Sequence, residues 1–459
     1  ARLDVGESAF WLLAGAEFSF DIRLALIDEA TSSLDIQYFI WERDPTSHLF
    51  AHRVVQAADR GVRVRILLDD LTLHGQDAEF AALDKHPNIS VRTFNPWQSR
   101  TKVGRVTEFL FRLDQVNHRM HNKIVLADQR FGIVGGRNIG DRYFGVWDAF
   151  VQNDLDVMAA GPVTADMAAS FDLYWNSPLS YRIGDIVKPK AAERALEPTV
   201  AWFEHSYRSA AEQLTGYLSK TDGWDEFLNE IATEFIVGRA RFEQDLPHVD
   251  QARPMQLYEP MLDLMAAAEE RVLISTAYLI PDERFYELVE RLENRGVDVT
   301  ILTNSMASNN HKVAHTGYRP WRKKLLALGV ELYEAREDSP HIREYTVPPV
   351  EPGFLGLHHK VIVVDDDQSF IGSPNIDPRS LVINTELGLF IESEGMAAAL
   401  TEMLARDTSP EAAWRVYLND KGRLRWESAA GELKQQPALS VFQRFMTFLI
   451  NLLPLKGQA

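Results

Sequence analysis

The 459-residue chain contains no cysteine. Disulfides, iron–sulfur clusters and thiolate catalysis are therefore excluded, although this absence does not identify the compartment. Basic residues are also scarce relative to acidic ones, with 48 Lys and Arg against 66 Asp and Glu and a formal net charge of −18. We therefore expect no nucleic-acid partner and no bulk attraction to an anionic surface, although a local basic patch can still bind phosphate.

Long hydrophobic runs are missing as well. No apolar run reaches the roughly 18 to 20 residues that a transmembrane helix requires. Hydrophobic residues nevertheless make up 46% of the chain and aromatic residues 10%, which is enough for a large core. The length then indicates two or more domains, or one large duplicated unit.

A repeat at one fixed offset favours one large duplicated unit. His121, Lys123 and Asp128 form an H-x-K-x4-D pattern, which returns 237 residues later. The residues matched at this offset are His121 with His358, Lys123 with Lys360, Asp128 with Asp365, Gly135 with Gly372, and Asn138 with Asn375. Five matches at one offset indicate an internal duplication.

Each copy of the repeat also carries the same order of predicted elements. Alternating apolar residues predict strands at 33–40 and 271–280, and a helix end, a glycine and a strand follow at 58–70 and 293–305. Helices alternating with strands predict an α/β fold, in which helices cover a mostly parallel or mixed sheet. We expect two halves related by a pseudo-twofold axis, with one site at their interface. The predicted regions are 1–176 (first half), 177–254 (helical connector, with helical patterns near 200–220 and 224–240), 255–436 (second half) and 437–459 (amphipathic segment).

The paired motif predicts a phosphate site. Residues i and i+2 of a strand share a face, so His121 and Lys123 project together, as do His358 and Lys360. Lysine and asparagine side chains can donate hydrogen bonds to phosphoryl oxygens and stabilise the transition state. One neutral histidine can attack phosphorus while the other moves protons, and no metal or cofactor is required.

A histidine nucleophile also needs an orienting acceptor on its other ring nitrogen. Two carboxylates, Asp154 and Glu386, lie at matching places downstream of the two motifs, and Asp156 competes with Asp154 for this role. His359 stands between His358 and Lys360, and strand alternation predicts that it points away from the site.

At this point the sequence resembles the phospholipase D superfamily. The two H-x-K-x4-D motifs carry the resemblance, and the segments RMHNK, VGGRNIGDRYFG, FIGSPNIDPRS and NTELGL are similar to bacterial type C cardiolipin synthases. The resemblance implies a phosphatidyltransferase acting through a phosphohistidine, with phosphatidylglycerol as the donor and a second phospholipid alcohol as the acceptor; phosphatidylethanolamine is a further candidate lipid. A hydrolytic phospholipase D is the alternative, and a nuclease a more remote one. The motif positions that carry over are His121, Lys123, Asp128, Asn138, His358, Lys360, Asp365, Ser373 and Asn375. The family tendency makes His121 the nucleophile, and it gives Asp128 and Asp365 a bracing role in the fold.

Two segments are candidates for lipid contact. Residues 98–119 mix basic and apolar side chains, among them Arg105 and Arg112, and predict either a loop that guides an anionic lipid or a solvated helix packed on the body. In the second half His315, Tyr318 and Arg322 are candidates for head-group contacts.

Residues 438–455 place their polar side chains on one narrow helical face. This pattern predicts an interfacial membrane anchor or a helix over an apolar channel, with an ordinary core helix as the alternative. Together with the resemblance, it implies peripheral membrane association in the bacterial cell envelope. The sequence does not predict the oligomeric state.

Overall fold

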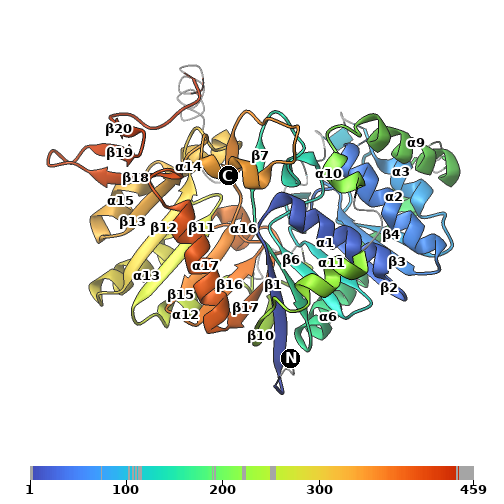
Figure 1. Ribbon diagram of the computed structural model, residues 1–459, viewed down its shortest axis with the longest axis horizontal. Coiled ribbons are helices and arrows are strands. Elements are labelled where there is room, and N and C mark those ends of the chain that lie inside the picture. The colour runs from blue at the N-terminus through green and yellow to red at the C-terminus, as the bar shows by residue number, and fades with distance from the viewer. Residues whose placement is uncertain are drawn as a thin grey trace.

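The computed structural model describes residues 4–73, 75–101, 104–105, 108, 111, 116–188, 190, 193–219, 224–248, 255–440 and 443. Its two halves lie side by side, the first coloured blue to cyan and the second yellow to red (Figure 1). The first half comprises β1 (Glu7–Leu13), α1 (Ala16–Glu29), β2 (Ser33–Tyr38), α2 (Pro45–Asp59), β3 (Arg63–Asp69), α3 (Asp77–Leu83), β4 (Ile89–Phe94), β5 (Ile124–Ala127), β6 (Phe131–Gly135), the 3-10 turn η1 (Asp141–Tyr143), β7 (Val151–Asn153), β8 (Asp156–Ala160), α6 (Val163–Trp175), β9 (Ser180–Arg182) and α7 (Ile183–Ile186).

Among the described residues, three helices follow before the second half begins. They are α9 (Leu196–Ser209), α10 (Thr215–Leu218) and α11 (Trp224–Ile231). The remaining elements are β10 (Ile236–Gln244), α12 (Tyr258–Ala266), β11 (Arg271–Thr276), α13 (Glu283–Asn294), β12 (Asp298–Asn304), α14 (Lys312–Tyr318), α15 (Trp321–Leu328), β13 (Glu331–Ala335), η2 (Pro340–Tyr345), β14 (Leu355–Leu357), β15 (Lys360–Val364), β16 (Gln368–Gly372), α16 (Pro378–Val382), β17 (Leu387–Glu392), α17 (Glu394–Asp407), β18 (Ala413–Leu418), β19 (Leu424–Ser428) and β20 (Gly431–Leu433). The predicted α/β fold with two repeated halves is confirmed.

One continuous 18-stranded sheet runs through both halves. Its first-half strands are paired in the order β9-β4-β3-β2-β5-β6-β8-β1. Its second-half strands continue as β10-β17-β16-β15-β11-β12-β13-β18-β19-β20. In each half three parallel strands are followed by an antiparallel hairpin that carries the motif, as β2, β3, β4 with β5–β6 and as β11, β12, β13 with β15–β16.

The strand β10 corrects the prediction of a wholly helical connector. Residues 236–244 form this strand rather than continuing a helix, and β10 pairs antiparallel with β1 on one side and with β17 on the other. Strand β1 is the edge strand of the first half-sheet, and β10 is the equivalent edge strand of the second. Their pairing therefore joins the two half-sheets at the centre of the molecule (Figure 1). The segment thus contributes the central pairing of the sheet.

A shared apolar core also connects the halves. Helix α6 packs its buried Met167 and Phe171 into the same cluster as Leu400 and Leu404 of α17. Another cluster lies under α1 and α2 and includes Val347 of the second half, and one under α13 and α15 is formed by the second half alone. Burial of a cluster from both halves opposes their separation, because apolar area would return to water.

The prediction of a membrane anchor at residues 438–455 stays a prediction. Most of the predicted amphipathic segment 438–455 lies outside the described residues. One exception is Gln443, whose side-chain amide donates a hydrogen bond to the carbonyl of Met306 at 2.7 Å. Within the described ranges, no helix is long and apolar enough to cross a membrane.

Candidate active site

The two motifs meet at one cavity between the halves. Its volume is about 610 Å³, and His121, His358, Asn138 and Asn375 all line it. Each histidine immediately precedes a motif hairpin, since β5 begins at Ile124 and β15 at Lys360. The sequence repeat therefore brings four of its matched residues to one place.

Each histidine is oriented by a carboxylate from the opposite half. His358 Nδ1 lies 2.5 Å from Asp154 Oδ2, and His121 Nδ1 lies 2.8 Å from Glu386 Oε2. Both carboxylates are fully buried. Because both rings use Nδ1 for these hydrogen bonds, each ring presents Nε2 to the cavity. Neither half alone holds a complete histidine–carboxylate pair.

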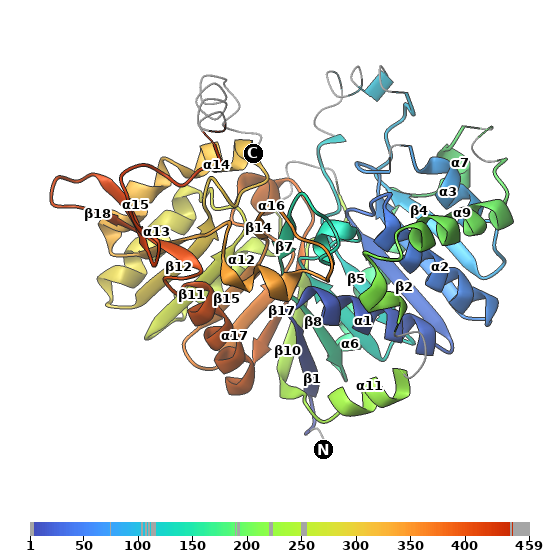
Figure 2. The ribbon, with the colours of Figure 1, turned by 45° about the horizontal axis from the view of Figure 1, so that its top comes forward.

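Short strand pairings fix this crossed arrangement. Strand β7, which precedes Asp154, pairs in parallel with β14, which precedes His358 (Figure 2). The backbone N–H of His358 donates to the carbonyl of Asn153 at 2.7 Å. On the other side the N–H of His121 donates to the carbonyl of Thr385 at 2.9 Å. Each histidine is thus hydrogen-bonded through its backbone next to the carboxylate that holds its ring.

The two motif lysines are buried behind the histidines. Lys123 Nζ donates to the carbonyl of His121, and Lys360 Nζ donates to the carbonyl of His358. Burial lowers the pKa of Lys123 to about 7 and that of Lys360 to about 8. An anion in the cavity would raise both values, because it favours the charged form of each lysine.

Burial also decides the charge of the histidine rings. It lowers the pKa of His121 to about 4 and that of His358 to about 3, so both rings are neutral at pH 7. Burial alone would raise the pKa of the carboxylates Glu386 and Asp154, but the neighbouring histidine and lysine hold both pKa values below their usual range. The site therefore contains ionised carboxylates that accept Nδ1–H from neutral imidazoles.

Small residues at one repeat position make room for these carboxylates. Ser373 Oγ donates to Glu386 Oε2 at 2.5 Å. The matching residue of the first half is Gly136, where a Cβ atom would stand 2.1 Å from Asp154 Oδ1. The shorter aspartate thus requires glycine beside it, whereas the longer glutamate leaves space for a serine hydroxyl.

The two motif aspartates lie at the far ends of their strands. Asp128 accepts the backbone N–H groups of Thr31, Ser32 and Ser33 at 2.7 to 3.0 Å. Asp365 accepts those of Glu269, Glu270 and Arg271 at 2.8 to 2.9 Å. Both aspartates have positive φ angles, 53° and 50°, at the turns that follow β5 and β15. Neither lines the cavity of the histidines, and this placement agrees with a bracing role.

The competing carboxylate Asp156 faces a different cluster. Its Oδ2 pairs with Arg23 at 2.7 Å and with Arg137 at 3.2 Å, and both arginines are buried. The structure therefore places Asp154, rather than Asp156, against a histidine.

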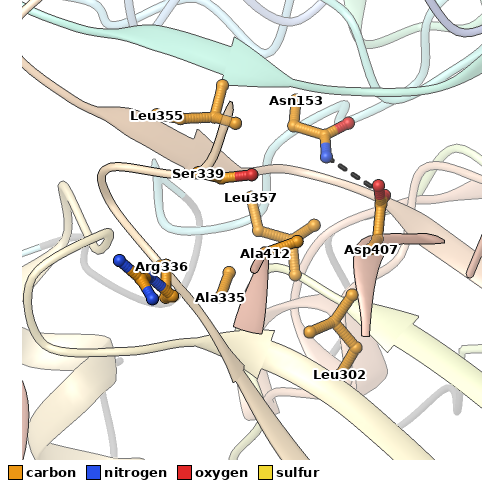
Figure 3. Close-up of a pocket in the computed structure, with 9 residues that line it drawn as sticks. All are labelled: Asn153, Leu302, Ala335, Arg336, Ser339, Leu355, Leu357, Asp407 and Ala412. Carbon is orange, nitrogen blue, oxygen red and sulfur yellow. Dashed lines mark hydrogen bonds between the residues drawn. The ribbon is translucent and has the colours of Figure 1, made fainter. Parts of the chain in front are cut away.

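A further polar cluster lies behind His358. His359 is fully buried and outside the cavity lining, with Nδ1 3.3 Å from the hydroxyl of Ser275. Asp407 at the end of α17 accepts the amide of Asn153 at 3.1 Å (Figure 3). Since Asn153 adjoins Asp154, this hydrogen bond connects α17 to the segment that carries the carboxylate partner of His358.

The predicted lipid-contact residues have different outcomes. Arg112 lies outside the described residues. Arg105 pairs with Asp70 at 3.3 Å, and its guanidinium carbon lies 5.6 Å from the ring centroid of Trp97, which lines the cavity. The nearby Arg119 lines the cavity itself.

The prediction of head-group contacts by His315, Tyr318 and Arg322 needs correction. All three side chains are buried and none lines the cavity. Arg322 Nε lies 2.6 Å from Glu334 Oε1, and the Tyr318 hydroxyl donates to the same oxygen at 3.0 Å. His315 instead contacts Gln436, at 3.2 Å. The side chains of Tyr318 and Arg322 thus meet Glu334, an internal carboxylate on β13, which the local sequence pattern does not reveal.

Sequence reasoning missed several residues that line the cavity. Arg142 and Arg379 both face it and are themselves separated by 237 residues, so the offset rule, extended a few positions, would have found them. Tyr143 and Tyr278 also line it. The offset rule would not have found Tyr143, because the residue 237 positions later is Ser380.

Two duplicated α/β halves that each bring a histidine to one cavity, with a buried lysine behind it, define a phospholipase D-type enzyme, of the phosphatidyltransferase and phosphodiesterase class. A family model described as "Cardiolipin synthase, PLD-like domain" matches residues 24–175 and 261–408. The chain belongs to this family.

Individual relatives agree with this assignment. Cardiolipin synthase C of Escherichia coli (strain K12) is 36% identical over 472 residues, which cover 98% of this chain and 96% of the relative. Cardiolipin synthase A of Pseudomonas putida is 27% identical over 399 residues, with coverage of 86% and 67%. The crystal structure of a phosphatidylserine synthase from Haemophilus influenzae Rd KW20 shares the fold, with a TM-score of 0.60 at 13% identity and coverage of 88% and 86%.

Proposed function

We propose that the protein transfers a phosphatidyl group from phosphatidylglycerol to the hydroxyl of a second phospholipid, as a cardiolipin synthase does. The observation that carries this proposal is the pair of crossed histidine–carboxylate contacts, at 2.5 and 2.8 Å, whose two histidines line one cavity. The two buried lysines donate to the backbone carbonyls of these histidines. A cavity of about 610 Å³ suits a drug-sized ligand, so it holds lipid head groups while the acyl chains remain outside.

In the first step His121 attacks the donor phosphorus through Nε2. Its neutral ring is nucleophilic, and Glu386 stabilises the positive charge that develops on the ring. The P–N bond forms as the bond from phosphorus to the glycerol oxygen breaks. Lys123 and Lys360 stabilise the charge on the phosphoryl oxygens without a metal ion.

His358 manages the protons in both steps. An anionic phosphodiester in the cavity favours the protonated ring, which then donates its Nε2 proton to the departing glycerol. In the second step the neutral ring accepts the proton of the incoming lipid hydroxyl. The P–N bond breaks as the new P–O bond forms, and His121 is regenerated.

The assignment of the two roles follows the family tendency and has support in the contacts. Asp154 Oδ2 is 2.5 Å from His358, while Glu386 Oε2 is shared between His121 and the Ser373 hydroxyl. An unshared carboxylate oxygen at short range stabilises a full imidazolium best. This condition matches the ring that must carry the proton.

Peripheral association with a membrane of the bacterial cell envelope follows from lipid substrates of this kind. The cavity lining mixes apolar side chains, such as Phe39, Leu71 and Trp97, with cations, which is a suitable entrance for an anionic head group.

The test is incubation with labelled phosphatidylglycerol, with and without phosphatidylethanolamine, followed by mass spectrometry of the lipids. Cardiolipin is the expected product, and phosphatidic acid alone would identify a hydrolase instead. His121→Ala and His358→Ala should abolish both products, while His205→Ala, at an exposed position, serves as the matched control. Full activity in either active-site variant would refute the mechanism.

A further inference from the structure

Two arginines line the cavity in addition to the motif residues. Arg142 follows Asn138 by four residues, and Arg379 follows Asn375 by the same interval. Both side chains face the cavity that contains the histidines. The repeat thus supplies one arginine from each half, and the question is whether both serve the same anion.

Their surroundings differ in charge. Arg142 forms an ion pair with Glu42, with 2.5 Å between Nη2 and Oε1. Arg379 donates to the side-chain oxygen of Asn117 at 2.8 Å and to its carbonyl at 3.2 Å, and it lies 3.4 Å from Asn384 Oδ1. These acceptors are neutral, and among the described residues Arg379 has no ion pair with a carboxylate.

Burial of this guanidinium is costly, and the charges of the carboxylates Asp377, Asp69 and Glu386 offset that cost only in part. Arg379 is partly buried, and burial lowers its pKa, so desolvation opposes its charge. The two asparagines hold the guanidinium in position at the cavity wall. A guanidinium fork held in this way matches two phosphate oxygens better than a flexible lysine does.

The reacting phosphate already has its own cations. Lys123 and Lys360 belong to the histidine motifs and lie directly behind His121 and His358. A donor such as phosphatidylglycerol contributes one phosphate only. The acceptor phospholipid contributes a second phosphate, separated from its reacting hydroxyl by a short glycerol bridge.

We propose that Arg379, positioned by Asn117 and Asn384, binds the phosphate of the acceptor lipid and so selects phospholipid alcohols over simple alcohols and water. This inference rests on the proposed function and adds an acceptor subsite to it. While Arg379 holds that phosphate, the terminal hydroxyl of the acceptor reaches the phosphohistidine, the P–N bond breaks, the P–O bond forms, and the hydroxyl proton passes to His358. The product then has one phosphate at the lysines and one at Arg379.

The experiment uses the full chain with vesicles of phosphatidylglycerol and phosphatidylethanolamine in buffer that contains deuterated glycerol. Transfer to lipid gives cardiolipin, and transfer to glycerol gives deuterated phosphatidylglycerol. Both products require the donor, the nucleophile and the proton relay, but only cardiolipin requires the acceptor phosphate. In Arg379→Gln we expect cardiolipin formation to fall roughly 10- to 100-fold, the loss of one charge-assisted contact, with glycerol exchange within about twofold of wild type.

Arg379→Lys keeps the charge but lacks the guanidinium fork, so its rate of cardiolipin formation should lie between those of wild type and Arg379→Gln. Arg284→Gln is the matched control, since Arg284 is half exposed and pairs with Glu259 on the surface. Continued glycerol exchange shows that the variant is folded. An equal loss of both products in Arg379→Gln, or no loss of either, would overturn the subsite, whereas a wild-type chain that forms neither product would overturn the proposed function and the subsite with it.

Discussion

Replacing Asp154 by asparagine should reverse the tautomer of His358. Asp154 Oδ1 accepts the backbone N–H of Leu155 at 2.9 Å, so the asparagine carbonyl must occupy that place. Its NH₂ group then takes the place of Oδ2, which lies 2.5 Å from His358 Nδ1. Two donors cannot share this contact, so Nδ1 must become the acceptor and the proton must move to Nε2. A ring in that state cannot accept a proton from the incoming hydroxyl.

Glu386→Gln provides the matched comparison, because its geometry does not force the same reversal. Glu386 Oε2 accepts from both His121 Nδ1 and the Ser373 hydroxyl, at 2.8 and 2.5 Å. The other oxygen, Oε1, is buried and has no hydrogen-bond partner in the described part of the chain. The glutamine carbonyl can therefore replace Oε2, with the NH₂ group in the place of Oε1, and His121 keeps its proton on Nδ1.

These geometries predict different magnitudes. Loss of one charge-assisted hydrogen bond costs about 1.5 to 3 kcal/mol, so Glu386→Gln should lower kcat by roughly 10- to 150-fold. An imidazole held in the wrong tautomer costs serine proteases about 10⁴ in kcat. We therefore expect Asp154→Asn to lower kcat by roughly 10³- to 10⁴-fold, or about 4 to 5.5 kcal/mol.

The assay has two independent readouts. Cardiolipin formation from vesicles gives the rates, and ¹⁵N NMR of selectively labelled histidine rings reports which nitrogen carries the proton. The expected spectrum shows a changed tautomer for His358 in Asp154→Asn and an unchanged one for His121 in Glu386→Gln. Equal rate losses, or an unchanged His358 tautomer, would refute the reasoning.

Three further predictions concern the lysines, the brace and the small residue at the site. Burial lowers the pKa of Lys123 to about 7 and of Lys360 to about 8, so the protonated forms that attract phosphate are lost as the pH rises through these values. We expect kcat/KM to fall as the pH rises through about 7 and about 8, and a profile that stays flat to pH 10 would contradict this. Asp128→Ala removes the acceptor of three backbone N–H groups and should lower the free energy of unfolding by roughly 2 to 4 kcal/mol in urea titrations, with KM unchanged. A variant as stable as wild type would argue against the bracing role. Gly136→Ala places a Cβ atom 2.1 Å from Asp154 Oδ1 and should lower kcat at least about tenfold without loss of fold by circular dichroism, and wild-type turnover would show that the carboxylate can move aside.

The sequence predicts the halves and the paired motif because both are local and repeated. A strand, a histidine and a lysine recur together, and duplication removes the ambiguity of a single copy. The crossing of the carboxylates is not predictable in the same way. It depends on β7 pairing with β14 and on the bridge between Met120 and Thr385, which join segments more than 200 residues apart.

The errors also have physical reasons. In β10 the residues Gly238, Ala240 and Phe242 alternate with the charged residues Arg239, Arg241 and Glu243, a period of two that the helical interpretation of 224–240 overlooked. The error at Arg322 has a different cause. A basic residue near aromatic residues gives the same sequence pattern whether its side chain contacts a head group or a buried carboxylate. Only the position of Glu334 on a neighbouring strand distinguishes the two.

The departures from symmetry in the site indicate how one catalytic cycle can use two similar histidines for different tasks. A fully symmetric site would give both rings the same partner and the same proton affinity. Here one ring has a short aspartate beside a glycine, and the other has a glutamate whose oxygen is shared with Ser373. Burial keeps both rings neutral in the site as it stands, with a pKa of about 4 for His121 and about 3 for His358. The unshared contact of Asp154 therefore stabilises a charged His358 only when an anion enters the cavity and favours the protonated ring. If this difference assigns the roles, then Ser373→Ala, which leaves Glu386 to His121 alone, should raise the proton affinity of His121, and NMR titration of the ring nitrogens can measure the change.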